Sequence, residues 1–102
     1  MDKGIFELSQ RVRSLKRQIK DLPKQCEELK EQVAFAQKQV DELSALQFSE
    51  DPKERARFVD AHCKRVFLSA ELAKKESSLT IARYELNKIN EIDAELRQQQ
   101  PE

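Results

Sequence analysis

A heptad repeat of apolar residues in the first 43 positions constrains this chain more than any other feature. Apolar side chains recur there at alternating spacings of three and four, for more than five heptads without a slip. Residues spaced in this way share one helix face and form the a/d seam of a coiled coil, so the repeat predicts a helix over about residues 3–46. The positions of this first seam are Ile5, Leu8, Val12, Leu15, Ile19, Leu22, Cys26, Leu29, Val33, Ala36, Val40 and Leu43.

Pro23 interrupts this stretch without disturbing its phase. A proline inside a helix removes one backbone hydrogen bond and clashes with the carbonyl four residues earlier, at a cost of roughly 3 kcal/mol. The seam nevertheless keeps its spacing from Leu22 to Cys26, as it would in a helix that only bends. We therefore favour one continuous helix that is kinked near Pro23. The alternative is a break after Lys20, which would make three helices in all.

The repeat ends near residue 48, where the sequence changes to signals for a loop and a new helix. Asp51 can accept hydrogen bonds from free backbone amides, Pro52 suits the first helical position, and Glu54 occupies the capping-box position. These signals predict a loop over about 47–51 and a second helix over about 52–97. The tail, residues 98–102, has nothing to bury and is expected to fray.

Charge alternates in four blocks, and the alternation indicates how the two helices pair. Residues 1–25 hold seven basic and three acidic side chains, and residues 26–50 hold two and six. Residues 51–75 hold seven and four, and residues 76–102 hold three and six. Folding the chain near residue 50 brings blocks of opposite sign together, whereas a parallel dimer would align like charges. The sequence therefore predicts an all-α fold, a single domain over 1–102, built as a long antiparallel, coiled-coil-like hairpin.

The predicted second helix carries two apolar stripes on nearly opposite faces, so it should have two neighbours. One stripe, named here the second seam, consists of Phe58, Ala61, Leu68, Leu72, Leu79, Ala82, Leu86 and Ile89, with Arg65 and Lys75 as polar positions within it. After Ile89 the apolar pattern of this seam shifts phase, to Ile92 and Leu96. The opposite stripe, named here the outer stripe, consists of Ala56, Val59, Cys63, Val66, Phe67, Ala70 and Ala73.

Three occupants would fit the outer stripe. A second copy of the chain would make a dimeric four-helix bundle, and this is the occupant we favour. The segment 3–20, folded back at Pro23, would make a three-helix bundle. A helical segment of another protein would make a mixed complex. The expected partners are therefore the chain itself, as a homodimer, a helix of another protein, or both.

The sequence contains no pattern that indicates catalysis, a cofactor or a metal. It has no Gly-rich phosphate loop, no HExxH motif and only one histidine, His62. In a hairpin folded at residue 50, Cys26 and Cys63 are offset along the axis by about 16 Å, too far for a disulfide or a shared metal ion. We therefore expect a protein that is not an enzyme, has no catalytic, cofactor-binding or metal-binding residues, and takes no small-molecule substrate.

Two other kinds of function stay open. Four basic residues on the outer face of the first helix, Arg13, Arg17, Lys20 and Lys24, could follow an anionic surface such as nucleic acid. No nucleic-acid motif accompanies them and the chain has no net charge, so neither nucleic acid nor a membrane is the expected partner. Cys63 could alternatively make oligomerisation sensitive to oxidation, if it met the same cysteine of a second copy.

Composition supports an interaction protein in a reducing compartment. Charged residues make up 37% of the chain and apolar residues 38%, against typical values of about 25% and about 45–50%. The chain therefore has little core and much solvated surface. No leader peptide is evident at the start and two cysteines are present, which favours a cytoplasmic location. We expect an adaptor, an assembly factor or a small chaperone-like subunit that acts by docking helix faces.

Overall fold

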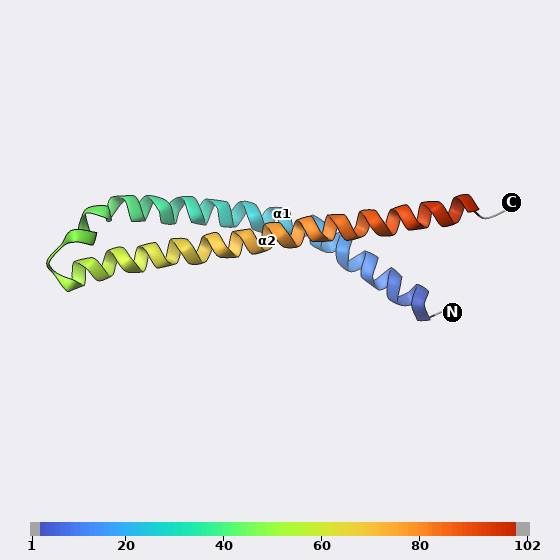
Figure 1. Cartoon of the computed structure of the whole chain (residues 1–102), viewed down its shortest axis with the longest axis horizontal. Coiled ribbons are helices and arrows are strands. Elements are labelled where there is room, and N and C mark those ends of the chain that lie inside the picture. Colours follow the sequence, from blue (N-terminus) through green and yellow to red (C-terminus); the bar gives the residue numbers. More distant parts are fainter. Residues whose placement is uncertain (1–2, 100–102) are drawn as a thin grey trace. The chain divides into compact units, whose positions relative to one another are not determined.

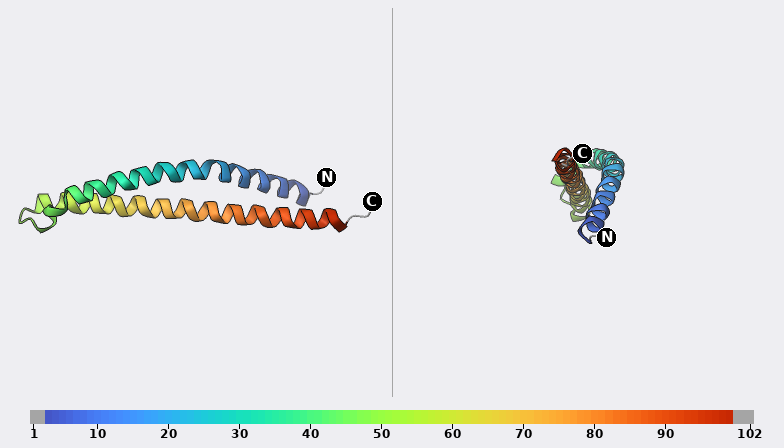
Figure 2. Two further views of the ribbon diagram at one scale, coloured as in Figure 1. Left: turned by 90° about the horizontal axis from the view of Figure 1, so that it is seen from above. Right: turned by 90° about the vertical axis from the view of Figure 1, so that its right-hand side faces the viewer.

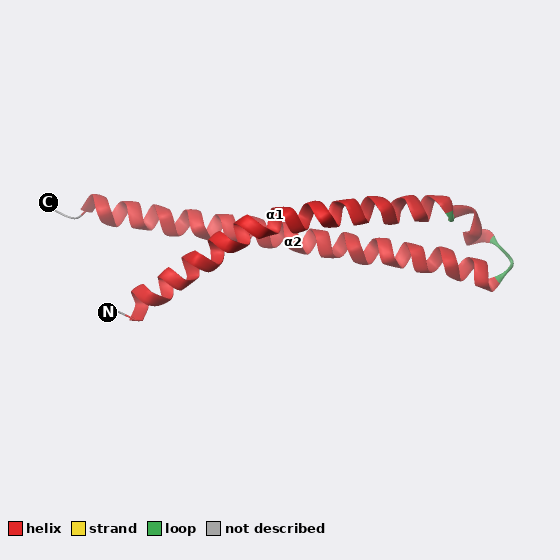
Figure 3. Ribbon diagram, turned by 180° about the vertical axis from the view of Figure 1, so that it is seen from behind, coloured by secondary structure: helices red, strands yellow, loops and turns green. Residues whose placement is uncertain are grey.

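The computed structural model of the chain describes residues 3–99 and consists of two long helices joined by a short turn (Figures 1 and 3). Helix α1 runs over Lys3–Glu42, a 3₁₀ helix η1 over Ser44–Phe48, and helix α2 over Pro52–Gln99. The described residues contain no β-strand, so the expected all-α class is confirmed. Residues 100–102, most of the tail that we expected to fray, lie outside the described residues, as does the side chain of Ile5.

The chain divides into two compact units, each made from a part of both helices. Among the described residues, the terminal unit contains 3–23 of α1 and 76–99 of α2, and the turn unit contains 24–75. Within the turn unit the two helical segments lie side by side, whereas in the terminal unit they cross and separate toward the chain ends. In both units they run in opposite directions (Figures 1 and 2). The predicted antiparallel hairpin is therefore confirmed. The expectation of a single domain stays a prediction.

Burial follows the two predicted seams. Leu15 and Ala36, both from the first seam, are each only 1% exposed. Among the described side chains of that seam, all are buried or half-buried except Leu8. In α2, Leu79 and Ala82 are buried, and the other predicted seam positions, including Arg65 and Lys75, are half-buried. Apolar side chains at three-four spacing on both helices thus meet along the hairpin, which is the packing that a heptad repeat provides.

Helix α1 continues through Pro23 without a break. The backbone therefore tolerates the missing N–H. Leu22 and Cys26, on either side of the proline, are both buried, which shows that the seam keeps its phase. The alternative of a break that would produce three helices is not found. Residues 3–20 consequently belong to α1 and do not form a third helix.

Helix α1 ends at Glu42, four residues before the predicted boundary near 46, and the chain continues as η1. The Ser44 hydroxyl donates a hydrogen bond to the Asp41 carbonyl (2.9 Å), and Leu46 N–H donates to the Leu43 carbonyl (2.9 Å). Serine side chains compete in this way with backbone N–H groups for backbone carbonyls. Hydrogen bonds between residues i and i+3, as in a 3₁₀ helix, are common at the end of an α-helix. The turn therefore starts earlier than the apolar repeat indicates.

The start of α2 is capped by side chains, as its sequence predicts. The Asp51 carboxylate accepts a hydrogen bond from the Lys53 N–H (3.0 Å), next to Pro52 at the first helical position. Glu54 does not reach back to the Asp51 N–H directly. It accepts a hydrogen bond from the Ser49 hydroxyl (2.5 Å), which itself accepts from Asp51 N–H (3.1 Å). The Ser49 hydroxyl thus bridges the Glu54 carboxylate and the Asp51 N–H, which bond directly in a standard capping box.

Replacing the capping carboxylate tests this description of the turn. Asp51→Ala leaves the Lys53 N–H without its acceptor, and we expect a loss of about 1 kcal/mol in the free energy of unfolding. Urea denaturation followed by circular dichroism measures this loss. Glu50→Ala, at the exposed neighbouring position, is the control and should change stability little. Equal effects of the two variants would contradict the capping role of Asp51.

Pro23 offers a second test, in the opposite direction. Pro23→Ala restores a backbone N–H and removes the ring from the interior of α1, so the free energy of unfolding should rise by up to about 3 kcal/mol. The same denaturation experiment reports the change, and Lys24→Ala provides the neighbouring control. A loss of stability in Pro23→Ala would show that the packing around residue 23 requires the proline.

Candidate functional site

The outer stripe of α2 is a predicted surface whose side chains the structure leaves exposed. All seven of its side chains are exposed, including Val66 at 49% and Phe67 at 64%. They lie on the helix face away from the second seam, because the spacing of about 100° per residue places the two stripes on opposite sides. Single exposed apolar residues are common, whereas a row of seven along one helix face is the pattern from which the sequence predicts a contact surface.

The whole outer stripe belongs to the turn unit, and none of the described residues buries it. Its small members, Ala56, Ala70 and Ala73, alternate with the larger Val59, Cys63, Val66 and Phe67. A helix could therefore approach closely at the alanines and pack around the larger side chains. The predicted residues are brought together on one face, and their use as an interface stays a prediction.

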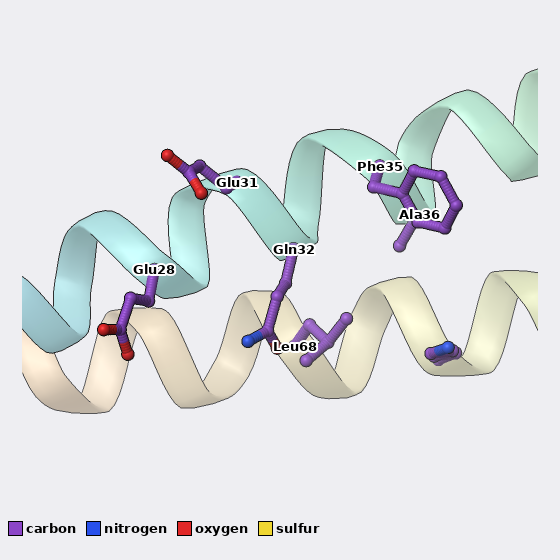
Figure 4. Close-up of a pocket in the computed structure, with 7 residues that line it drawn as sticks. Glu28, Glu31, Gln32, Phe35, Ala36 and Leu68 are labelled. Atoms are coloured by element: carbon purple, nitrogen blue, oxygen red, sulfur yellow. The ribbon is translucent and has the colours of Figure 1, made fainter.

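A shallow groove of about 500 Å³ lies beside this surface, between α1 and α2 of the turn unit (Figure 4). Gln32 extends from α1 toward Leu68 of α2, and Phe35 and Ala36 lie one turn further along α1. Phe35 is 60% exposed, so its ring is an apolar surface that the seam does not use. Lys64, Glu28 and Glu31 supply charge to the rim of the groove. Phe35 lies on α1 outside the first seam, so the apolar repeat gave no signal for it.

The two cysteines differ sharply in their surroundings, as their positions predict. Cys26 is a buried residue of the first seam, whereas Cys63 is exposed on the outer stripe, and both are free thiols. His62 is also exposed and stacks on Phe58, with ring centroids 6.0 Å apart and planes inclined by 11°. Its Nδ1 lies 3.4 Å from a guanidinium nitrogen of Arg65. Cys26, His62 and Cys63 do not form a cluster, and oxidation sensitivity through Cys63 stays a prediction.

The four predicted basic residues, Arg13, Arg17, Lys20 and Lys24, are all exposed on α1. Arg13 also borders an apolar groove of the terminal unit, which Leu8, Ile92 and Leu96 help to line. This groove was not predicted, although the phase shift of the apolar pattern after Ile89 was a signal for it. Binding of an anionic surface by the four basic residues is not tested by the structure and stays a prediction.

One ion pair joins the two helices of the terminal unit. The Arg11 guanidinium donates two hydrogen bonds to the Glu85 carboxylate, one of them Nη2 to Oε1 at 2.9 Å. The hydrogen bonds from Arg11 hold the pKa of the Glu85 carboxyl below its ordinary value, and those to Glu85 raise the pKa of the guanidinium. Arg11 comes from the basic first block and Glu85 from the acidic fourth block. The pair therefore agrees with the charge alternation that predicted the fold.

Residues 3–99 contain no group of three or more His, Cys, Asp or Glu side chains arranged to hold a metal ion. In the same range, neither helix has an apolar stretch long enough to cross a membrane. Comparisons of the chain with protein-family models, curated proteins and solved structures found no match. The function must therefore be argued from the surfaces described above.

The Arg11–Glu85 pair predicts a pH dependence of stability. Because the pKa of Glu85 is lowered in the folded chain, its contribution is present above the ordinary pKa of a glutamate and is lost as pH falls through the lowered value. Both side chains are exposed, so Glu85→Gln should lower Tm only slightly at neutral pH, and less at high salt. Thermal unfolding followed by circular dichroism measures both dependences.

Glu95→Gln, at another exposed position of α2, removes the same charge without removing the pair. This control should change Tm less than Glu85→Gln at neutral pH. The difference between wild type and Glu85→Gln should disappear in acid. A difference that persisted below the lowered pKa of Glu85 would contradict an ionic origin.

Proposed function

We propose that this protein is a non-enzymatic protein–protein interaction module that docks an amphipathic helix of another protein on the outer stripe. The observation that carries the proposal is the continuous exposure of Ala56, Val59, Cys63, Val66, Phe67, Ala70 and Ala73 on one face of α2. Seven such positions over 18 residues offer a strip about 26 Å long, which matches a partner helix of nearly three heptads.

Charge selects among the occupants of the outer stripe. The segment 51–75, which carries the stripe, holds seven basic and four acidic side chains, and five of the basic ones lie outside the second seam, to which Arg65 and Lys75 belong. If two copies met stripe to stripe, two segments with a small excess of positive charge would face each other, and like charges across an interface oppose association. A partner helix with acidic flanks complements the segment instead. Residues 3–20 are part of the continuous helix α1 and form no separate helix that could fold back on the stripe.

Adaptors, assembly factors and small chaperone-like subunits all work by this kind of contact, and the proposal assigns the chain to that broad class. Within the turn unit the second seam packs α2 against α1, while the outer stripe lies on the opposite face of α2. Helix docking of this kind needs no deep pocket or reactive side chain. Affinity comes from burying the apolar strip, and selectivity comes from the charges on its flanks.

Two synthetic peptides of three heptads test the proposal. Both carry leucine at a and d positions, one with glutamate on its flanks and the other with lysine. We expect the glutamate peptide to bind the full chain and the lysine peptide to bind at least about tenfold more weakly, as measured by fluorescence anisotropy. Val66→Asp should weaken binding of the glutamate peptide at least about tenfold, because it buries a charge in an apolar contact.

Ala34→Asp, at an exposed position of α1 in the same unit, is the matched control and should bind like wild type. Circular dichroism of both variants confirms that the helices are intact. Equal binding of the two peptides, or full binding by Val66→Asp, would contradict the proposal. Self-association that Val66→Asp abolishes would overturn it too, by showing that a second copy occupies the stripe.

A further inference from the structure

The terminal unit contains a second apolar surface, a groove of about 470 Å³ between the first turns of α1 and the last turns of α2. Its apolar lining consists of Leu8, Val12, Ile89, Ile92 and Leu96. None of these residues belongs to the outer stripe. The groove is therefore a separate surface, and its occupant can be inferred independently of the proposed function.

The groove exists because the two seams do not close there. Leu8 is a first-seam residue but remains 50% exposed, whereas Leu15, one heptad later, is only 1% exposed. On α2, the apolar pattern changes phase after Ile89, and Ile92 and Leu96 are 57% and 56% exposed. Two helices thus present seam residues that they cannot bury against each other. Additional helices packed into the groove would bury them.

The charges on the rim of the groove show which helices fit. The α1 side of the groove carries Arg13 and Lys16, and the α2 side carries Asp93. The same polarity extends over the unit, since residues 3–23 hold six basic and two acidic side chains, whereas residues 76–99 hold three and five. A partner must therefore be acidic where it meets α1 and basic where it meets α2.

A second copy of this chain satisfies that requirement by symmetry. Rotation by 180° about an axis that runs along the groove places α1 of one protomer over α2 of its partner, and the reverse. The basic rim then meets the acidic rim twice, as in an isologous interface, and each helix has antiparallel neighbours of opposite charge. A single helix with one sign of charge on its flanks would be repelled on one side of the groove.

We infer that the chain forms a homodimer through this groove, in which the terminal units of two copies combine into a four-helix bundle. Leu8, Ile92 and Leu96 enter the core of that bundle. Lys16 of one protomer lies opposite the acidic rim at Asp93 of its partner. The outer stripe takes no part in this dimer.

The solution mass tests the inference directly, by light scattering coupled to size exclusion over a micromolar concentration series with reductant present. Wild type should approach twice the 11.9 kDa of one chain. Ile92→Asp should weaken the dimer at least about tenfold, because it places a carboxylate in the bundle core. Ile81→Asp is the matched control, since Ile81 is 63% exposed in the same unit, does not line the groove and should leave the dimer intact.

Charge reversal supplies a second test that does not depend on a core substitution. The double variant Arg13→Glu with Lys16→Glu gives a protomer with two acidic rims, and Asp93→Lys gives a protomer with two basic rims, so each variant alone should dimerise more weakly than wild type. A mixture of the two should regain the dimer mass, because the acidic copy then faces the basic copy. Recovery on mixing arises only between protomers and would not follow from a contact within one chain.

Three outcomes would overturn the inference. Wild type could stay at the mass of one chain throughout the series, Ile92→Asp could dimerise as well as Ile81→Asp, or the mixed charge variants could fail to recover. A dimer that Val66→Asp abolishes and Ile92→Asp preserves would move the interface to the outer stripe. Failure of peptide binding to the stripe, by contrast, leaves this dimer unaffected, so the two proposals are tested separately.

Discussion

The burial of one apolar seam of α1 against one apolar seam of α2 is the interaction on which the whole structure depends. Residues 3–99 form only two helical layers, so no other element among them removes these side chains from water, and the gain of about 25 cal/mol per Å² of buried apolar surface must come mainly from this contact. The small residues Ala36 and Ala82 are among the most completely buried. Their small side chains allow the two helices to approach closely. Such close packing requires the regular three-four spacing of apolar residues that both helices show.

That same arrangement explains why apolar side chains stay exposed at the outer stripe and at the groove of the terminal unit. Helix α1 uses its main apolar face for the hairpin, but α2 has two such faces and can turn only one toward α1. Near the chain ends, even the seam residues exceed what two helices can cover. The outer stripe and the terminal groove therefore have one physical origin, a supply of apolar helix surface greater than a two-helix layer can bury. Their flanking charges differ, which is why we assign them different occupants.

The sequence was sufficient for features that depend on local spacing or on few residues. The seams, the exposed outer stripe, the different environments of Cys26 and Cys63, and the Asp51 cap all follow from helical periodicity and short-range hydrogen bonding. The early end of α1 was not predicted, because Ser44 competes for a backbone carbonyl without changing the apolar repeat. The exposure of Leu8 was missed as well, since periodicity places a residue on a face but does not show whether the facing helix still covers it.

Because the two thiols differ in exposure, their relative reactivity reports local opening of the folded chain. An alkylating reagent reaches Cys63 directly on the folded chain, whereas it reaches Cys26 only when the seam around that residue opens. When reclosure is fast compared with alkylation, the rate at Cys26 relative to that at Cys63 measures the free energy of this local opening. The chain thus carries both the probe and its reference, without an added label.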